Sequence, residues 1–391
     1  TATFTAFRRL LDLCERESPD FLLLAGDVYN QEDASVSAQL ALRDGFRRLE
    51  SLSIPVFLVH GNHDPLASRL RSVRWPGNVT VFGELPDAVP VFRKGEGTPL
   101  AIIHGASHAS GRETRNLAAL FRRTEACGLH VGLLHATPGD ADGVARYAPF
   151  SQEDLKASGM DYWALGHIHD RREVCREPLA AYPGCTQGLH INEPGEKGCL
   201  LVTAEARPDG GYAVRTSFRP LGPAVWKTLD MDLGGAASLD ELENRLRTGL
   251  DRAAAEVWSG CEMLLVRLRL QGRTELDGLL RKGTTCAELA DRLREDGNGV
   301  PRIWIKDIDV ATRPCVERGA LLEREDLLGE VFRLSEAART ASGLQALREG
   351  PLAPLFAHAR AGKALEPLTD EELARLLDDA ESLCLDLLEN D

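Results

Sequence analysis

Three things are scarce in this 391-residue sequence: long apolar runs, closely spaced cysteine pairs and an excess of positive charge. No apolar run approaches the roughly 18 residues that a membrane-spanning helix needs, so we expect no membrane span. The nine cysteines are scattered and never stand in CxxC spacing. This argues against a zinc ribbon or a disulfide framework, and it fits a reducing cytoplasm. We therefore expect a cytoplasmic protein.

The formal net charge of −14 is not what a nucleic-acid-binding protein usually carries, so its distribution matters. Residues 364–391 contain ten acidic residues and one basic residue, and they account for −9 of the total. The rest of the chain is nearly balanced. Charge alone therefore gives no support for a local basic groove, although it leaves room for one.

The first 220 residues alternate amphipathic stretches with short apolar runs. Apolar residues at helical spacing predict helices at the start of the chain and over residues 35–51. Short, mostly apolar runs predict buried strands over residues 21–24, 56–59, 79–82, 100–103, 131–134 and 162–165. We also predict a helix over 117–123, a helix that begins at a Ser151/Asp154 capping box, and strands over 199–203 and 212–218. Buried strands that alternate with helices indicate an α/β sheet.

The pattern changes near residue 221. Strands over 226–233, 263–270 and 303–310, together with helices over 239–258 and 287–295, predict a compact α+β unit. From residue 323 the chain is mostly helical, and the last helix begins at a capping box at Thr369. This helix carries a leucine stripe that predicts either an ordinary core helix or a docking surface for a partner. The stripe comprises Leu373, Leu376, Leu377, Ala380, Leu383, Leu387 and Leu388. We therefore expect three parts, residues 1–220, 221–318 and 319–391.

Metal-capable side chains follow four of the predicted strands. Asp27, Asn62, His135 and His167 each lie within about three residues of a strand end. Ligands of α/β proteins bind beyond the carboxyl ends of the strands, so these side chains should meet at one edge. His169 would point the same way as His167 if that segment is extended. Mixed oxygen and imidazole ligands suit divalent Mn, Fe, Zn or Mg ions.

Each of these residues also has an ordinary structural role open to it. Asp27 can be a turn or helix-cap residue, and His135 can be a buried histidine without a ligand. The motif Gly61-Asn62-His63-Asp64 can be an Asx-type turn before Pro65. The metal site is favoured because four strands supply suitable side chains to the same edge.

Such a site suits phosphoester hydrolysis. Two divalent ions about 3.5–4 Å apart can hold a phosphoryl group and lower the pKa of a water between them. His63 stands beside Asn62 and is not needed as a ligand, so its imidazole can protonate the leaving oxygen.

These residues resemble the calcineurin-like metallophosphoesterase superfamily. The resemblance rests on Gly26-Asp27, residues 61–64, His135 and residues 166–169. The sequence between them narrows it. Residues 20–27, 147–149, 161–169, 182–184 and 187–188 are similar to SbcD-like DNA repair exonucleases, particularly the bacterial YhaO-type branch. The resemblance covers residues 1–220 and continues more loosely beyond them.

The resemblance implies a four-layer α-β-β-α metallophosphoesterase sandwich, a smaller α+β capping domain and C-terminal helices. It implies a metal-dependent DNA nuclease, usually an exonuclease, that acts in double-strand-break repair or DNA end processing. It also implies two divalent ions, Mn²⁺ first among them, and an SMC-like ATPase partner of the SbcC type; a homodimer stays open.

The resemblance also assigns the site residues. It implies that Asp27 bridges the two metal ions and that Asn62, His135 and His167 complete one site. His169 would serve the other ion. By the same resemblance, His63 would be the catalytic histidine.

One part of the family pattern is not found in this sequence. The family begins with a strand that carries Asp-x-His, which supplies two ligands to the metal that His169 serves. We expect that a segment with this motif precedes Thr1; a natural loss of that metal site is the other reading. In the sequence as given, we expect weak or absent metal binding at the site served by His169, and a gap in the sheet.

Three arginines close behind His63 are candidates to contact DNA phosphates, although each can equally be an ordinary solvated side chain. They are Arg69, Arg71 and Arg74. Two other functions stay open. One is a phosphoesterase that acts on a small molecule or a phosphoprotein. The other is a non-catalytic DNA- or ATPase-binding scaffold, if the first metal motif is truly absent.

Overall fold

The computed structural model describes residues 1–29, 36–67, 73–139, 146–208, 210–295, 299–315, 318–358 and 368–388. The chain forms two compact units that interleave along the sequence. The first comprises Thr1–Asp232, Glu243–Leu270 and Leu280–Ala311, and the second comprises Leu233–Leu242, Gln271–Leu279 and Thr312–Asp391. The division at residues 220 and 318 stays a prediction.

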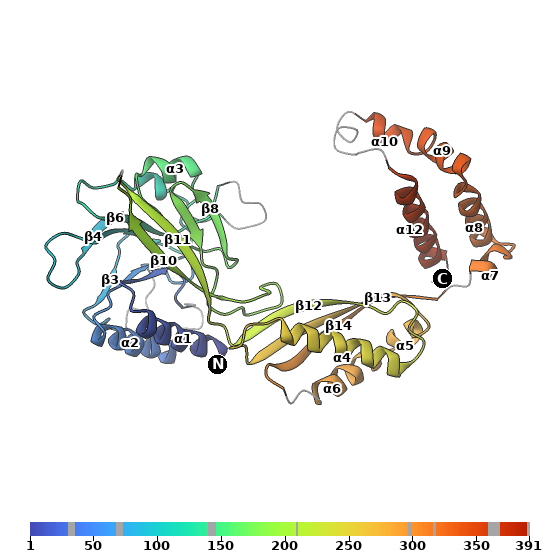
Figure 1. The fold of residues 1–391 in the computed structure, drawn as a ribbon, viewed down its shortest axis with the longest axis horizontal. Coiled ribbons are helices and arrows are strands. Elements are labelled where there is room, and N and C mark those ends of the chain that lie inside the picture. Colours follow the sequence, from blue (N-terminus) through green and yellow to red (C-terminus); the bar gives the residue numbers. More distant parts are fainter. Residues whose placement is uncertain are drawn as a thin grey trace. The chain divides into compact units, whose positions relative to one another are not determined.

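The first unit contains a six-stranded sheet of order β4-β5-β6-β7-β9-β8 and a three-stranded sheet of order β1-β2-β3 (Figure 1). The elements up to β9 are α1 (Ala2–Glu17), β1 (Leu22–Ala25), α2 (Val36–Ser51), β2 (Val56–Val59), β3 (Val79–Val81), β4 (Asp87–Val91), β5 (Ala101–Ala106), the 3-10 helix η1 (Ala118–Leu120), β6 (Leu129–His135), α3 (Gln152–Ala157), β7 (Tyr162–Gly166), β8 (Arg172–Arg176) and β9 (Leu179–Tyr182). β10 (Gly198–Ala206) and β11 (Tyr212–Pro220) form a separate two-stranded sheet.

Three apolar cores separate four layers. In the first core, Leu10 of α1 and Phe46 of α2 pack with the outer face of β2. In the middle core, the other face of β2 packs with Val131 and Leu133 of β6. In the third core, Trp163 of β7 packs with η1 and α3. The predicted α-β-β-α sandwich is therefore confirmed, and each buried strand is apolar on both faces because each face meets another layer.

In each of the two sheets, the strands that carry or precede the predicted metal ligands run parallel to one another. β1, β2 and β3 are mutually parallel, with Ala25 opposite Val59. β5, β6 and β7 are also parallel, with His135 opposite Gly166. The residues that follow β1, β2, β6 and β7 consequently start from matching ends of their sheets.

Several elements differ from the sequence predictions. The helix predicted over 117–123 is wrong: only the three-residue η1 forms there. β4, β8 and β9 were not predicted. β1 is apolar yet only half-buried, and it pairs with β2 alone among the described strands. This open edge is compatible with the expected gap in the sheet, which stays a prediction.

The later elements form a second sheet system and a helical region. β12 (Ala224–Asp232), β13 (Met263–Thr274) and β14 (Arg302–Pro314) form a three-stranded sheet, and α4 (Leu239–Ala255), α5 (Asp277–Leu280) and α6 (Thr285–Glu295) lie between its strands in sequence. The helices that follow are α7 (Arg318–Leu322), α8 (Leu327–Ala338), α9 (Ala341–Glu349), α10 (Ala353–Ala357) and α12 (Asp370–Leu388).

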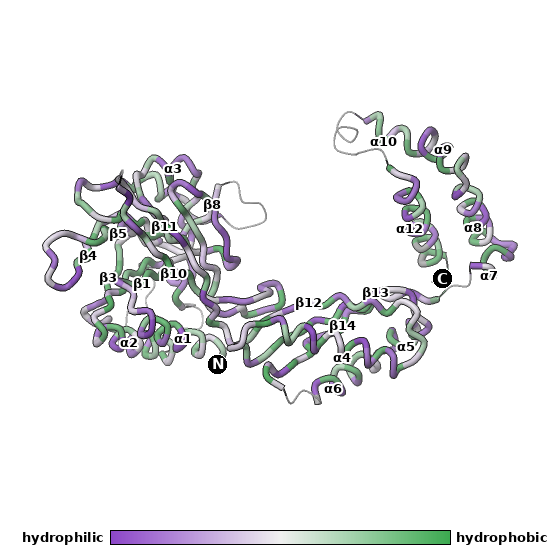
Figure 2. The backbone as a smooth tube through the Cα atoms, in the orientation of Figure 1, coloured by the Kyte–Doolittle hydropathy of each residue, from purple (hydrophilic) through white to green (hydrophobic). Residues whose placement is uncertain are grey.

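The leucine stripe of α12 divides between core and surface. Within the stripe Leu373 is buried, whereas Leu383 and Leu387 are exposed. Leu385, outside the predicted stripe, packs with Leu328 and Phe332 of α8. Figure 2 shows hydrophobic and hydrophilic segments alternating along this helix. Among the described residues, no helix combines the length and the apolar character needed to cross a membrane.

Candidate metal centre

Four of the predicted ligands come together at the carboxyl ends of β1, β2, β6 and β7. Ligand atoms of Asp27, His135 and His167 all lie within 4.8 Å of one another. His135 Nε2 is 3.1 Å from Asp27 Oδ2 and 3.0 Å from Asn62 Oδ1. The structure thus brings together two oxygen ligands from one sheet and two imidazoles from the other.

The hydrogen bonds of His135 show that this group fits a cation. His135 Nδ1 is 2.8 Å from the carbonyl oxygen of Ala25, so Nδ1 carries the proton and donates it. In the neutral ring Nε2 is then a bare lone pair, and it faces the oxygens of Asp27 and Asn62. Converging lone pairs repel unless a cation lies between them, and a metal ion meets that need.

Close backbone approaches make this geometry possible. A Cβ atom at Gly166 would lie 1.8 Å from the carbonyl oxygen of Ala25, so only glycine allows β7 to end there. His167 follows with a φ of 103°, and Asp27 has a φ of 50°. Non-glycine residues seldom adopt positive φ, and such strained conformations concentrate at functional sites.

Asp64 ties the two loops of the three-stranded sheet together. Its carboxylate is fully buried and accepts hydrogen bonds from the backbone N–H groups of Asp27, Val28 and Gly61. His63 N in turn donates to Asp27 Oδ1 at 2.8 Å. Asp27 is therefore fixed by the loop that carries Asn62, whether or not a metal is bound.

The electrostatics of Asp27 favour an ionised carboxylate. Burial raises the pKa of Asp27, but a proton on His135 Nε2 and the His63 N–H outweigh burial and lower it to about 2; a metal ion at Nε2 would take the place of that proton. The carboxylate is thus charged at neutral pH, as a metal ligand must be.

His169 belongs to a second group of side chains, with Cys185 and Glu193. His169 Nδ1 is 2.5 Å from Glu193 Oε1. The extended geometry that we expected across residues 167–169 is wrong, because β7 ends at Gly166 and the positive φ of His167 turns the chain. Burial raises the pKa of the Cys185 thiol to about 11, with the Glu193 charge adding to it.

The predicted catalytic histidine and the three candidate arginines come between β2 and β3 in the sequence. His63 is exposed and lies beside Asp27 through its backbone. Arg74 is exposed, with no ion pair to the described residues. Arg69 and Arg71 lie outside the described residues.

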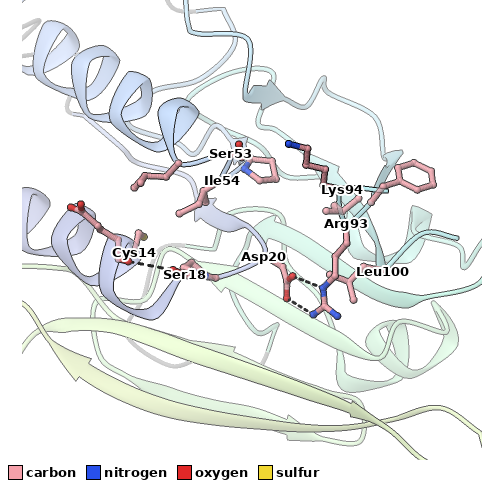
Figure 3. Close-up of a pocket in the computed structure, with 14 residues that line it drawn as sticks. Cys14, Ser18, Asp20, Ser53, Ile54, Arg93, Lys94 and Leu100 are labelled. Carbon is pink, nitrogen blue, oxygen red and sulfur yellow. Dashed lines mark hydrogen bonds and ion pairs between the residues drawn. The ribbon is translucent and has the colours of Figure 1, made fainter. Parts of the chain in front are cut away.

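Two pockets differ in their relation to this centre. A pocket of about 370 Å³ is lined by His60, Leu66, Val73 and Trp75, so it adjoins the Asn62 loop. A pocket of about 260 Å³ lies at the amino ends of β1 and β2 (Figure 3). There Asp20 pairs with Arg93 through two hydrogen bonds of 2.9 and 3.1 Å. This second pocket is remote along the strands from the metal ligands.

Two families of known proteins match the chain. Residues 2–171 match the calcineurin-like phosphoesterases, and residues 226–313 match the middle domain of metallophosphoesterase YhaO. The "Uncharacterized metallophosphoesterase YhaO" of Bacillus subtilis strain 168 is 33% identical over 356 residues, which cover 90% of this chain and 83% of that protein.

More distant relatives are named as DNA repair proteins. The "DNA double-strand break repair protein Mre11" of Aeropyrum pernix is 26% identical over 65% of this chain and 63% of its own length. The protein of the same name from Haloferax volcanii is 24% identical over 85% of this chain and 72% of its own length. This chain belongs to the calcineurin-like metallophosphoesterases, and within them to the YhaO type. The family implies divalent metal ions and phosphoester chemistry.

Sequence reasoning missed two supporting carboxylates. Asp64 was recognised as part of the motif but not as the anchor of both loops. Glu193 gave no signal, because its partner His169 is 24 residues away and no periodic pattern links them.

Proposed function

We propose that this metallophosphoesterase is a DNA nuclease, acting as an exonuclease in double-strand-break repair or DNA end processing. The observation that carries the proposal is the convergence of Asp27, Asn62, His135 and His167 on one point between the two sheets. DNA as the substrate is supported by the repair name of the relatives from A. pernix and H. volcanii.

In this proposal the four converging side chains would hold one divalent ion, and Asp27 and His169 would serve a second. Mn²⁺ is the expected metal, and the second site is expected to be weak or empty in this chain. When bound, such ions polarise a phosphodiester and lower the pKa of a coordinated water.

Side chains and backbone groups of the protein orient the ligands of that centre and can supply a proton to the substrate. Ala25 fixes the tautomer of His135. His108 Nε2 donates to the carbonyl oxygen of His135 at 2.6 Å and so holds the end of β6 in place. His63 is exposed beside Asp27, where its imidazole can protonate the leaving oxygen of a bound phosphodiester.

The DNA strand is expected to run past the loop after β2. Arg74 is exposed between Val73 and Trp75, which line the pocket that adjoins this loop. An arginine there can pair with a backbone phosphate. Arg69 and Arg71 remain candidates for the same role.

A partner is proposed for the helical end of the chain. Leu376, Leu383 and Leu387 of α12 are 46%, 56% and 66% exposed, which suits an apolar docking surface. An SMC-like ATPase of the SbcC type is the partner that we propose. All nine cysteines are free thiols, which agrees with the proposed cytoplasmic location.

The test compares two Asp→Asn variants at opposite ends of β1. D27N removes the shared ligand, whereas D20N changes a carboxylate that pairs with Arg93 at the other end. With Mn²⁺ and end-labelled duplex DNA, D27N should lose more than about 100-fold in cleavage rate, and D20N should keep it.

The substrate class is tested in the same preparation. Nitrophenyl phosphate monoesters should be hydrolysed far more slowly than DNA. Faster hydrolysis of the monoesters would favour a small-molecule or phosphoprotein phosphatase. Metal binding without hydrolysis of any of these substrates would favour the scaffold.

A further inference from the structure

We propose that Glu193 is a positioning residue that fixes the tautomer of His169, so that Nε2 of this imidazole is presented as a metal ligand. The inference rests on the proposed function only for the identity of the metal site. Glu193 belongs to none of the motifs that define the centre, and it lies in the loop between β9 and β10.

The Glu193 carboxylate is held at both oxygens. It is only 6% exposed. Oε2 accepts the backbone N–H of Leu189 at 2.7 Å, and Oε1 faces His169 Nδ1 at 2.5 Å. His190 Nε2 is a more distant neighbour of Oε1, at 3.4 Å. A carboxylate fixed in this way can only accept, so the His169 Nδ1 opposite it must be the donor.

The main chain of His169 is fixed as well. Its carbonyl oxygen accepts the Cys185 N–H at 3.2 Å and Lys197 Nζ at 3.2 Å. Lys197 is itself buried and pairs with Asp170 at 3.0 Å. The ring and the backbone of His169 are therefore both held, while its side chain remains 54% exposed.

The consequence is that the lone pair of His169 is on Nε2. With the proton of the neutral ring on Nδ1, Nε2 is unprotonated and free to coordinate. His135 uses the same arrangement, with Ala25 as the acceptor in place of a carboxylate. A carboxylate behind a ligating histidine fixes the ring and increases its basicity, and its removal typically costs about 10–100-fold in metal affinity.

Glu193→Gln provides a specific test because it keeps the size of the side chain. The amide has one acceptor oxygen for two donors. The Leu189 N–H cannot change, so the amide oxygen should turn to it and the NH₂ group should face His169. His169 must then accept at Nδ1, which moves its proton to Nε2.

The readout is the tautomer of each histidine, from nitrogen chemical shifts of metal-free protein labelled in its ten histidines, at pH 8.5. We expect Nδ1–H for His169 in the wild type and Nε2–H in E193Q. E193A should lose the fixed Nδ1–H form. His135, held by Ala25, should stay Nδ1–H throughout and serves as the internal reference. H190A should leave His169 unchanged. An Nε2–H ring in the wild type, or an unchanged Nδ1–H ring in E193Q, overturns the proposal.

A Zn²⁺ titration carried to millimolar metal gives the second readout, as the shift of the His169 Nε2 resonance on coordination; Zn²⁺ is diamagnetic, so this shift reports a bond to the nitrogen and not the nearness of an ion in the first site. E193Q should need about 10–100-fold more Zn²⁺ than the wild type for an equal shift of His169 Nε2. Because this site is expected to be weak, the titration must reach millimolar Zn²⁺; a coordination shift of His135 without any shift of His169 Nε2 at that concentration overturns the ligand role. Failure to cleave DNA with the tautomers and the coordination shift intact would instead count against the proposed function alone.

C185S separates the proposal from a metal site built on the thiol. The proposal expects the Zn²⁺-induced shift of His169 Nε2 to be unchanged in C185S. A sulfur-to-cobalt charge-transfer band in the Co²⁺-loaded wild type that disappears in C185S would show that Cys185 and Glu193 bind the metal themselves, and it would overturn the positioning role.

Discussion

Replacing Asp64 should loosen the metal centre without removing any ligand. Its buried carboxylate is the common acceptor for three backbone N–H groups in the loops after β1 and β2. Oδ1 is 3.1 Å from Asp27 N and 2.7 Å from Gly61 N, and Oδ2 is 3.0 Å from Val28 N. D64N is nearly isosteric, while D64A removes the acceptor altogether.

The expected cost follows from the number of bonds. A hydrogen bond to a charged group contributes about 1.5–3 kcal/mol, and a buried donor left without a partner costs a similar amount. D64N can keep the oxygen toward Asp27 and Gly61, but its NH₂ group then faces Val28 N–H. We expect D64N to lower the free energy of unfolding by about 2–3 kcal/mol and D64A by about 4–6 kcal/mol.

Hydrogen exchange reports this change locally. The amides of Asp27, Val28 and Gly61 should exchange faster in both variants, and the affinity for Mn²⁺ should fall because the backbone of Asp27 loses its anchor on Asp64. D161N is the matched control, since Asp161 accepts from His130 N at 2.8 Å at the amino end of β7. D161N should leave these three amides and Mn²⁺ binding unchanged. D64N with wild-type protection and a stability loss under about 0.5 kcal/mol would refute the reasoning.

Two further predictions concern pH and the partner. Burial and the neighbouring His130 lower the pKa of His104 to about 4. The unfolded chain takes up this proton near pH 6.5, so the free energy of unfolding should fall by about 3 kcal/mol between pH 6.5 and 4, as followed by urea unfolding. H104Q, which can still donate to His130 Nδ1, should remove the His104 share of this slope and leave the share of His108, whose pKa burial also lowers to about 4; an unchanged slope would contradict the assignment. For the partner, an SbcC-type ATPase should be pulled down by the full chain and not by a chain lacking residues 365–391, and undiminished capture would exclude that docking surface.

Much of the centre could be predicted because its ligands follow apolar strands. Asp27, Asn62, His135 and His167 are each close in sequence to a run that must be buried, so strand direction alone gathers them. The orientation of His169 could not be predicted, because it depends on the positive φ of His167 and on a tertiary contact with Glu193.

The elements missed in the fold are those whose sequences do not follow a simple pattern. β4 contains Pro90 at the edge of its sheet, where a strand tolerates the missing N–H. β8 carries charged residues at the opposite edge and contains a register shift. The stretch after Leu117 has apolar residues that suit a helix, but they are buried from a short 3-10 turn instead, because Phe121 and Ala118 reach the same core.

Because its ligands lie on two different sheets, a bound metal ion would also link those sheets structurally. Asp27 and Asn62 are carried by one sheet, and His135 and His167 by the other, with the middle core between them. An ion held by all four fastens the two halves of the sandwich to each other. Thermodynamic linkage then applies in both directions. Bound metal stabilises the packing between the two sheets, and a poorly fitting side chain in the middle core lowers the affinity for the metal.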